Sequence, residues 1–395
     1  MSFLLGVLIF VLALLFSVML HEAGHFLTAK KFGMKVTQFF VGFGQTLWSW
    51  QRGETEYGVK AIPAGGFVKI VGMTEMDDVD QADEPRSFRR QPGWQRIIVL
   101  AAGSFMHFVL AFVLLFLLVV GIGLATASSS TAVGAVDNCV PASLTAGCTR
   151  SDPASPARQV GIQPGDTIIA VAGAPVRNWT QMGQALRRQR PGTPVAVTVE
   201  RNGRQLTLHP SLAVIHGRSG SYLGVSPVVA FRRAGLLAGI SYAGSQFGQI
   251  TAGSVKVAAS LPRAIPDLFA KNRASTPGGQ VTSVVGAGDV TGQVLASRIG
   301  WQPKVSLVLL IVASLNIFVG LFNLLPLLPL DGGHLAVVIY ERIRAWLARL
   351  RGRPDPGPVD YRKLVPVSVG VFALLVGLGL LLIMADIVNP VHILQ

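Results

Sequence analysis

The chain has 395 residues, of which 50% are hydrophobic and only 14% are charged, and its mean hydropathy is +0.51. This balance is too apolar for an ordinary soluble domain and predicts several membrane-spanning segments. The formal net charge is +14, but the lysines and arginines form no stripe interleaved with aromatic residues, which argues against nucleic acid as a partner. We expect the basic residues to meet the lipid bilayer instead.

The first apolar segment, Ser2–Leu20, has no charged residue and is about long enough to cross a bilayer. It leads into His21-Glu22-Ala23-Gly24-His25, an H-E-x-x-H motif. Histidines at this spacing share one face of a helix and can hold one Zn²⁺, with Glu22 as general base. The alternative is a chance match on a solvated helix, which the adjoining span disfavours because buried ionisable groups are costly unless they are paired or bind metal. The motif predicts a membrane-embedded zinc hydrolase.

The segment from Gly42 to Met73 lacks helical periodicity. Thr46–Gln51, Thr55–Ala61 and Phe67–Val71 have the composition of strands, with glycine-containing turns between them. A small sheet beside the metal-binding helix would offer an edge strand that can pair with an extended peptide. The alternative is a solvated cytosolic hairpin.

Three further segments are long and apolar enough to span a membrane, namely Ile97–Leu124, Val305–Leu330 and Leu364–Ile387. Basic residues gather in the short connections after the first and third spans, so the positive-inside rule places these connections in the cytosol and both termini outside. The predicted fold class is a polytopic α-helical membrane protein with about four transmembrane helices and a re-entrant β-sheet segment.

The region Val160–Leu208 differs in character from the spans. Gly161-Ile162-Gln163-Pro164-Gly165-Asp166 precedes a strand at Thr167–Val171, a helix is predicted at Trp179–Arg190, and two further strands at Val195–Arg201 and Gln205–Leu208. This order resembles a PDZ domain of the bacterial protease-associated type, which implies that it binds an extended peptide by strand addition.

The chain therefore divides into four parts. Residues 1–124 carry the first two spans and the β-segment at about 42–73, and residues 125–215 form an extracytoplasmic α/β PDZ-like domain. Residues 216–304 are an extracytoplasmic amphipathic region, for which we expect helices that cover the membrane domain from outside. Residues 305–395 carry the last two spans.

Cys139 and Cys148 are the two cysteines of the chain, and both fall in the part that we expect to lie outside. An oxidising compartment favours a disulfide between them, and two free thiols are the alternative. Two cysteines are too few for a structural zinc site, which needs four ligands.

A catalytic zinc site needs a third protein ligand and an open position. Asp331 is the only carboxylate between Val305 and His334, and Pro326 and Pro329 should break the helix just before it. Broken helix at membrane depth is tolerated where it lines a cavity or packs in protein. Because the first and third spans end on the same side, we expect Asp331 to reach the depth of His21 and His25. The alternative is an aspartate that only caps a helix.

These motifs occur together and in order, and the chain resembles the site-2 proteases, specifically the bacterial regulator-of-sigma-E-protease-like group and its actinobacterial members with one PDZ domain. The resemblance implies an intramembrane zinc metalloendopeptidase with Zn²⁺ on His21, His25 and Asp331 and with Glu22 as general base. It also implies that Asn323 holds the substrate backbone or the oxyanion, and that the re-entrant β-segment clamps an unwound substrate helix.

The resemblance further implies membrane-anchored substrates, typically anti-sigma factors already trimmed outside by a site-1 protease. Regulated intramembrane proteolysis would then take place in the bacterial plasma membrane, with the active site toward the cytosol. Two alternatives stay open: a peptidase that clears remnant signal peptides, and a non-enzymatic PDZ-bearing membrane scaffold.

The sequence departs from the family pattern at two places. The usual Gly-Pro-x-x-Asn of the second span is Gly103-Ser104-Phe105-Met106-His107 here, and we do not count His107 as a metal ligand. The usual Pro-x-Pro before Leu-Asp-Gly is replaced by Pro326-Leu327-Leu328-Pro329, which affects the local backbone rather than Asp331.

Overall fold

The computed structural model describes residues 1–73, 77–141, 148, 151–215, 220–270, 273, 281–297 and 299–391. The chain forms two compact units. Unit 1 comprises Met1–Val119, Leu236–Arg273 and Gly278–Val391, and the main part of unit 2 is Val120–Gly235. The first half of the glycine-rich stretch at 275–292 lies largely outside the described residues.

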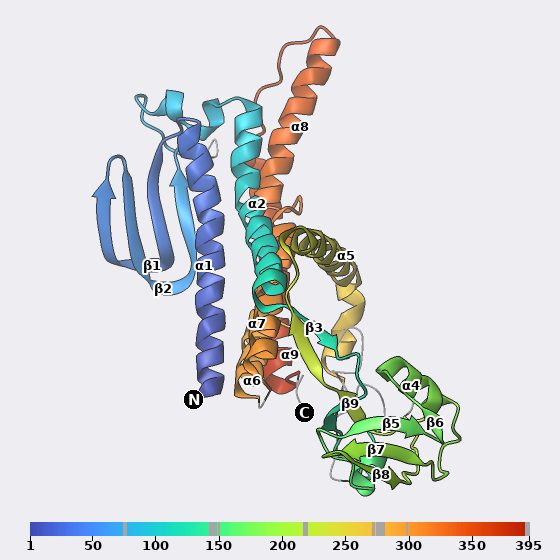
Figure 1. The fold of residues 1–395 in the computed structure, drawn as a ribbon. Helices are drawn as coiled ribbons and strands as arrows, with labels where there is room; N and C mark the ends of the chain where they lie inside the picture. Colours follow the sequence, from blue (N-terminus) through green and yellow to red (C-terminus); the bar gives the residue numbers. More distant parts are fainter. Residues whose placement is uncertain are drawn as a thin grey trace. The chain divides into compact units, whose positions relative to one another are not determined.

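Unit 1 is built mainly from long helices (Figure 1). Among the described residues, four helices are long and apolar enough to cross a membrane. They are α1 (Ser2–Lys31), α2 (Gly93–Leu117, continued by the π-helical turn η3 at Leu118–Ile122), α7 (Trp301–Asn323) and α9 (Val365–Val388). The remaining helical elements of this unit are η1 (Glu84–Arg86), η2 (Phe88–Arg90), α5 (Leu236–Leu268), α6 (Val284–Ala296), α8 (Asp331–Leu350) and η5 (Tyr361–Lys363).

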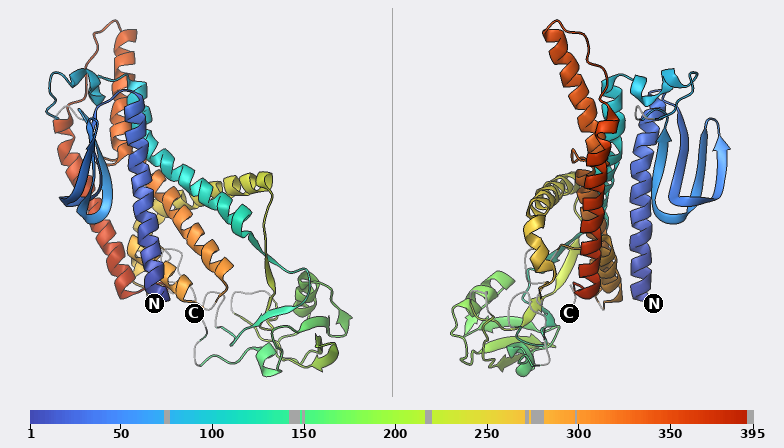
Figure 2. Two further views of the ribbon diagram at one scale, coloured as in Figure 1. Left: turned by 60° about the vertical axis from the view of Figure 1, so that its left-hand side comes forward. Right: turned by 180° about the vertical axis from the view of Figure 1, so that it is seen from behind.

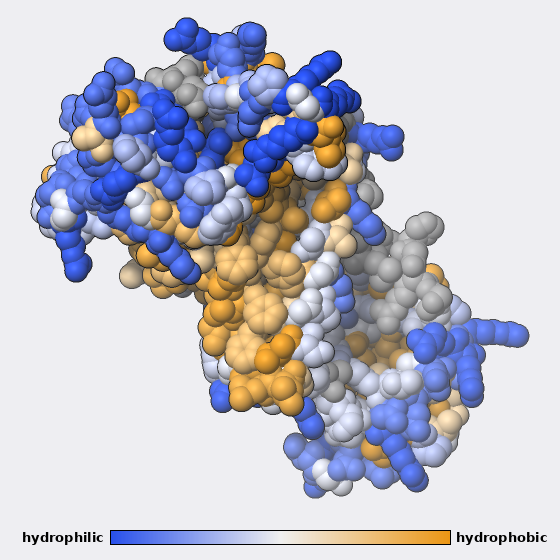
Figure 3. Space-filling view, turned by 90° about the horizontal axis from the view of Figure 1, so that it is seen from above, coloured by the Kyte–Doolittle hydropathy of each residue, from blue (hydrophilic) through white to orange (hydrophobic). Residues whose placement is uncertain are grey.

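The surface of the molecule agrees with a membrane-spanning helical unit. On the face drawn in Figure 3, apolar residues form a continuous patch that hydrophilic residues border. Many large apolar side chains of α1 and α9 are exposed, including Leu4, Leu12, Leu374 and Leu380. Such exposure is typical of helices that face lipid rather than a protein core.

The third membrane-spanning helix ends earlier than the sequence predicted. The expected span of Val305–Leu330 is the helix α7, which starts at Trp301 and ends at Asn323. Pro326 explains the early end, because proline lacks the N–H that helix continuation needs. The chain then turns through residues 324–330 and restarts as α8 at Asp331, so the expected helix break before Asp331 is present.

A β-sheet lies along α1 (Figures 1 and 2). It consists of two long bent strands, β1 (Val36–Arg52) and β2 (Thr55–Ile70). The sheet begins at Val36 rather than at Gly42, because residues 38–41 pair with residues 56–59 and also with residues 66–69 of β2. These residues therefore lie in the middle of the sheet, and residues 66–69 form one of its edges.

Small residues and a buried cluster hold the helices of unit 1 together. A Cβ at Gly6 would lie 2.8 Å from Cα of Gly292, so glycine lets α1 and α6 pack backbone to backbone. At the opposite end of α1, one apolar cluster joins α1, β1, β2, η2, α2 and α8 through buried side chains that include Met34, Phe88 and Val338. The region at 216–304 thus contributes α5 and α6, which pack against α2, α7 and α1.

Unit 2 contains a four-stranded sheet with the order β6-β5-β7-β8. Its elements are β5 (Thr167–Val171), β6 (Ala174–Pro175), β7 (Val197–Arg201), β8 (Arg204–Leu208), α3 (Pro156–Gln159) and α4 (Trp179–Arg187). Two strand pairs complete the unit: β3 (Leu124–Ala127) with β10 (Val229–Arg232), and β4 (Val133–Val136) with β9 (Val225–Pro227). Strand β5 has the bounds that the sequence predicted, and α4 ends at Arg187 instead of Arg190.

An ion pair and a disulfide stabilise unit 2 beside its apolar core. The Asp166 carboxylate accepts hydrogen bonds from Arg201 at 2.7 Å and from the backbone N–H of Gln163 at 2.8 Å. The bond from Arg201 is the main reason why the pKa of Asp166 lies below its ordinary value. Cys139 and Cys148 are joined by a disulfide.

Candidate metal centre

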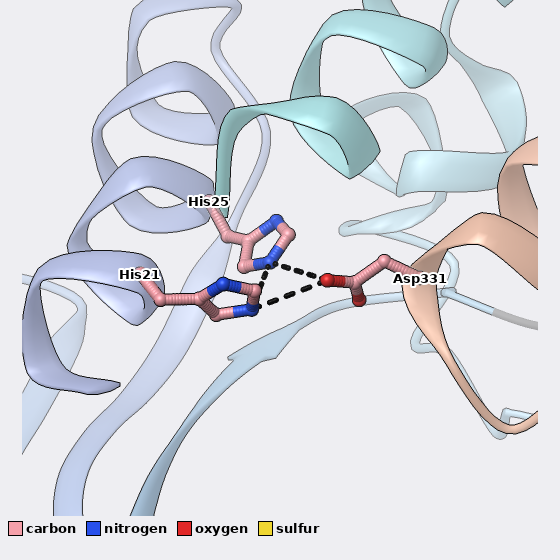
Figure 4. Close-up of side chains that lie close together, drawn as sticks. All are labelled: His21, His25 and Asp331. Carbon is pink, nitrogen blue, oxygen red and sulfur yellow. Dashed lines mark hydrogen bonds and ion pairs between the residues drawn. The ribbon is translucent and has the colours of Figure 1, made fainter. Parts of the chain in front are cut away.

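Three side chains from two distant parts of the sequence point toward one another in unit 1 (Figure 4). His21 and His25 lie on one face of α1, and Asp331 is the first residue of α8. The Nε2 atoms of the two histidines are 3.1 Å apart, and each lies near Oδ2 of Asp331, at 3.2 Å from His21 and 3.3 Å from His25. Within the described residues these three form the one cluster of at least three potential metal-binding side chains.

The distances fit a zinc ion. Ligand atoms about 2.0–2.2 Å from a tetrahedral Zn²⁺ lie about 3.3–3.6 Å from one another. The three observed separations of 3.1, 3.2 and 3.3 Å are close to this range. Two imidazole nitrogens would repel each other at 3.1 Å if both presented lone pairs with no cation between them, so the arrangement suits a metal. Three ligands leave a fourth position for the reaction.

A hydrogen bond at the second ring nitrogen, Nδ1, fixes the tautomer of His25. Nδ1 of His25 is 2.7 Å from the backbone oxygen of Val99 in α2. A carbonyl oxygen can only accept, so Nδ1 carries the proton and Nε2 keeps its lone pair for the metal. His21 has no such contact: among the described residues, its buried Nδ1 has no hydrogen-bond partner.

Glycines allow the helices to approach the site. A Cβ at Gly103 of α2 would lie 2.3 Å from Nε2 of His25 and 2.7 Å from Nε2 of His21. A Cβ at Gly24, inside the motif, would lie 2.6 Å from the backbone oxygen of Ala102. Both positions therefore need glycine, because real Cβ atoms do not approach other atoms so closely.

The glycines after Asp331 serve a similar purpose. A Cβ at Gly332 would lie 2.3 Å from the backbone oxygen of Leu325, and one at Gly333 would lie 2.5 Å from the backbone nitrogen of Leu328. The first turn of α8 thus packs directly onto the broken segment before it, and this packing holds Asp331 toward α1.

The side chain of Glu22 extends from α1 toward the edge of the sheet. The backbone of Val68 in β2 lies near its carboxylate. A Cβ at Gly66 would lie 3.5 Å from Cγ of Glu22 and 2.9 Å from Sδ of Met19, so glycine keeps β2 close to α1 at this point. Glu22, the candidate general base, therefore lies at the edge of the sheet, and it directly follows His21 in the sequence.

A buried polar network that sequence reasoning did not identify lies next to His21. The rings of His107 and His21 have centroids 5.0 Å apart, and Nδ1 of His107 is 2.7 Å from Oδ1 of Asn316 in α7. Nδ2 of Asn316 donates to the backbone oxygen of Val312 at 2.8 Å and to the Ser17 hydroxyl at 3.0 Å. Because Val312 can only accept, the amide orientation is fixed, Nδ1 of His107 carries the proton, and Nε2 is an acceptor.

Asn323 and His334 are not part of the cluster of His21, His25 and Asp331. Asn323 is the last residue of α7 and is partly buried, and none of the described contacts links its side chain to these three. His334, one turn along α8, stacks on Tyr361 with ring centroids 5.9 Å apart.

Ion pairs join the basic end of α1 to the sheet. Glu54, in the turn between β1 and β2, pairs with Lys30 at 2.6 Å and with Arg86 at 2.7 Å. The hydrogen bond from Arg86 is the main cause that lowers the pKa of Glu54 to about 2, although partial burial acts in the opposite direction.

The amino-acid sequence is similar to that of known metalloproteases. The model of peptidase family M50 matches residues 9–353. The zinc metalloprotease Rip1 of Mycobacterium tuberculosis is 36% identical over 418 residues, with both chains covered completely. Rip1 of Mycolicibacterium smegmatis is 36% identical over 420 residues, again with both chains covered completely. Metalloprotease MmpA of Caulobacter vibrioides is 29% identical, over 86% of this chain and 88% of its own. This chain therefore belongs to peptidase family M50, the site-2 protease family.

Proposed function

We propose that this protein is an intramembrane zinc endopeptidase that cleaves the transmembrane segments of single-span proteins. The observation that carries the proposal is the convergence of His21, His25 and Asp331 around one point, on helices of a membrane unit, with Glu22 between the two histidines in sequence. Relatives over the whole chain are named zinc metalloproteases, which supports Zn²⁺ as the metal. A membrane scaffold would not require a carboxylate at position 22.

The chemistry follows from the donor set. A zinc ion held by His21, His25 and Asp331 would act as a Lewis acid that polarises the scissile carbonyl and makes water nucleophilic near neutral pH. Glu22 takes a proton from the attacking water and later gives it to the leaving amine, so the same carboxylate acts first as base and then as acid. Val99 keeps His25 in the tautomer that binds metal, and Asp331 completes the ligand set.

The edge of the sheet offers a way to present a substrate. Residues 66–69 pair with residues 38–41 on one side, and no other described strand pairs with them. A transmembrane helix must unwind before cleavage, and pairing to an edge strand replaces the backbone hydrogen bonds that it loses. Since β2 passes close to Glu22 at Gly66, a strand added here would run beside the proposed general base. Asn323 is our candidate for holding the substrate backbone.

We propose that the substrates are membrane-anchored anti-sigma factors that a site-1 protease has first trimmed. The family resemblance supports this class, and a role in clearing remnant signal peptides is the competing one. Substrate trapping decides between them: cells that carry the Glu22→Gln variant should accumulate the uncleaved substrate on it, and mass spectrometry identifies the captured protein. Recovery of signal-peptide remnants alone would contradict the anti-sigma-factor assignment.

We further propose that unit 2 lies outside the cytosol and contains a PDZ-like gate. The order of β5, α4, β7 and β8 and the disulfide in this unit support the proposal. If the PDZ-like region excludes substrates that carry a large ectodomain, deletion of Val160–Leu208 should allow the enzyme to cleave them. If the region recruits substrate instead, the same deletion reduces cleavage of trimmed substrates. The assay compares one substrate with and without its ectodomain, on both enzyme forms.

A further inference from the structure

A polar cavity lies in unit 1, and neither His21, His25 nor Asp331 lines it. It has a volume of about 690 Å³ and lies between the segment that leads into α2 and the second half of α8. Arg342 of α8 follows Asp331 by three helical turns, which corresponds to about 16 Å along the helix. The volume is in the range of cavities that hold small ligands.

The cavity is lined by more positive than negative side chains. Five arginines face three carboxylates, and the arginines are Arg89, Arg90, Arg96, Arg342 and Arg349. Glu84 is already engaged by Arg89 at 2.6 Å and by Arg90 at 2.7 Å. Glu341 is engaged by Arg96 at 3.1 Å. The third carboxylate, Asp355, accepts a hydrogen bond from the backbone N–H of Gly357 at 3.0 Å. The two arginines of α8 therefore remain beside this one carboxylate.

Arg342 and Arg349 carry this excess of positive charge. Neither side chain forms an ion pair or hydrogen bond with any described residue, and both are exposed. The stem of Arg342 lies across the first residue of α2, since a Cβ at Gly93 would be 2.7 Å from Cδ of Arg342. Two free guanidinium groups at one cavity can bind a phosphate group through paired hydrogen bonds.

The position of the cavity along the spans indicates where the phosphate comes from. Arg96 is the last charged residue before the apolar run of α2, so this end of the helix marks the boundary of the hydrocarbon layer. Trp94 and Trp346, the latter in the cavity wall, are exposed at the same end. Exposed tryptophans are typical of the level of lipid headgroups.

We propose that this cavity binds the phosphate of an anionic lipid headgroup through Arg342 and Arg349. Basic pockets between membrane helices recognise such headgroups by charge and hydrogen bonding. A bound headgroup would bridge the start of α2 to α8, the helix that supplies Asp331. The proposal concerns lipid binding and does not require the protease assignment to hold.

The test uses the full-length protein in phosphatidylcholine micelles, titrated with brominated phosphatidylglycerol or brominated phosphatidylcholine. Quenching of tryptophan fluorescence reports binding, and Trp346→Phe shows which part of the signal comes from the cavity wall. We expect saturable quenching by phosphatidylglycerol, with an affinity that falls by about fivefold for each arginine removed, in Arg342→Gln and Arg349→Gln separately and together.

The matched control is Arg351→Gln with Arg353→Gln, which removes the same charge from the same end of α8 without touching the cavity lining. Titration with millimolar inorganic phosphate separates the two sources of the group: competition by phosphate, with no preference among lipids, would identify a soluble phosphate as the ligand. Equal effects of the lining and control variants, or equal quenching by the two lipids without phosphate competition, would overturn the proposal. Zinc content checks that each variant is folded.

Discussion

Gly103 in α2 lies against Nε2 of His25, the nitrogen that we propose binds the metal, with 2.3 Å between Nε2 and the place where a Cβ would be. A methyl group at this position must push the ligand away or separate α1 from α2. Overpacking of this kind costs about 1–3 kcal/mol. The relationship links helix packing directly to the geometry of the three ligands.

We therefore predict that Gly103→Ala reduces the zinc content of the purified protein. Gly377→Ala is the matched control, because no atom lies within 4 Å of a Cβ built at that glycine, which also belongs to a spanning helix. Metal analysis after dialysis against a weak chelator measures the effect. Normal zinc content in Gly103→Ala would mean that α2 does not press on the ligands.

The choice of third ligand gives a second prediction. Asp331→Ala should weaken zinc binding by more than the roughly 10- to 100-fold that follows the loss of an outer hydrogen-bond partner. His334→Ala should have little effect, since His334 stacks on Tyr361 rather than joining the cluster. Competition with a chelator of known affinity ranks the variants, and the reverse order would show that the wrong ligand was assigned.

The network of His107, Asn316 and Ser17 gives a third prediction. Asn316→Leu frees the His107 ring that packs on His21, so we expect zinc affinity to fall by about 10- to 100-fold, with a changed absorption spectrum of the Co²⁺-substituted protein. Ser17→Ala removes only the outermost hydrogen bond and should have a smaller effect. An unchanged spectrum and affinity in folded Asn316→Leu protein would show that the network does not orient His21.

The ion pairs of Glu54 predict a pH dependence of stability. The folded-state pKa of Glu54 is about 2, below its ordinary value of 4.5. A lowered pKa contributes stability above the ordinary value, and this contribution is lost as the pH falls toward 2. Glu54→Gln should lower the melting temperature at about pH 6 and reduce its decline between about pH 5 and pH 3. A parallel decline in both proteins would exclude Glu54 as a source of the acid sensitivity.

Local signals explain which parts of the structure could be predicted from sequence. The spacing of His21 and His25 requires only one regular helix, and the four spans follow from long apolar runs. Asp331 could be inferred although it is distant in sequence, because its segment contains no other carboxylate. Strand β5 followed from β-type residues bounded by turn residues.

Other features depend on contacts that no local pattern encodes. The requirement for glycine at position 103 comes from the crossing of α1 and α2, and the partner of His107 lies more than two hundred residues away. Residues 36–41 directly follow the turn after α1 and are too short a run to be recognised as a central strand. The cavity beside Arg342 and Arg349 likewise arises from the approach of α2 and α8, although both segments are visibly basic in sequence.

The central claim is that three residues bind zinc and Glu22 moves the proton. Its most direct test is the purified Glu22→Gln protein, assayed for metal content and for cleavage of a transmembrane peptide. We predict about one zinc per chain, as three ligands require, and a rate of cleavage lower by about 10²- to 10⁴-fold. Full activity of this variant with its zinc in place would contradict the account.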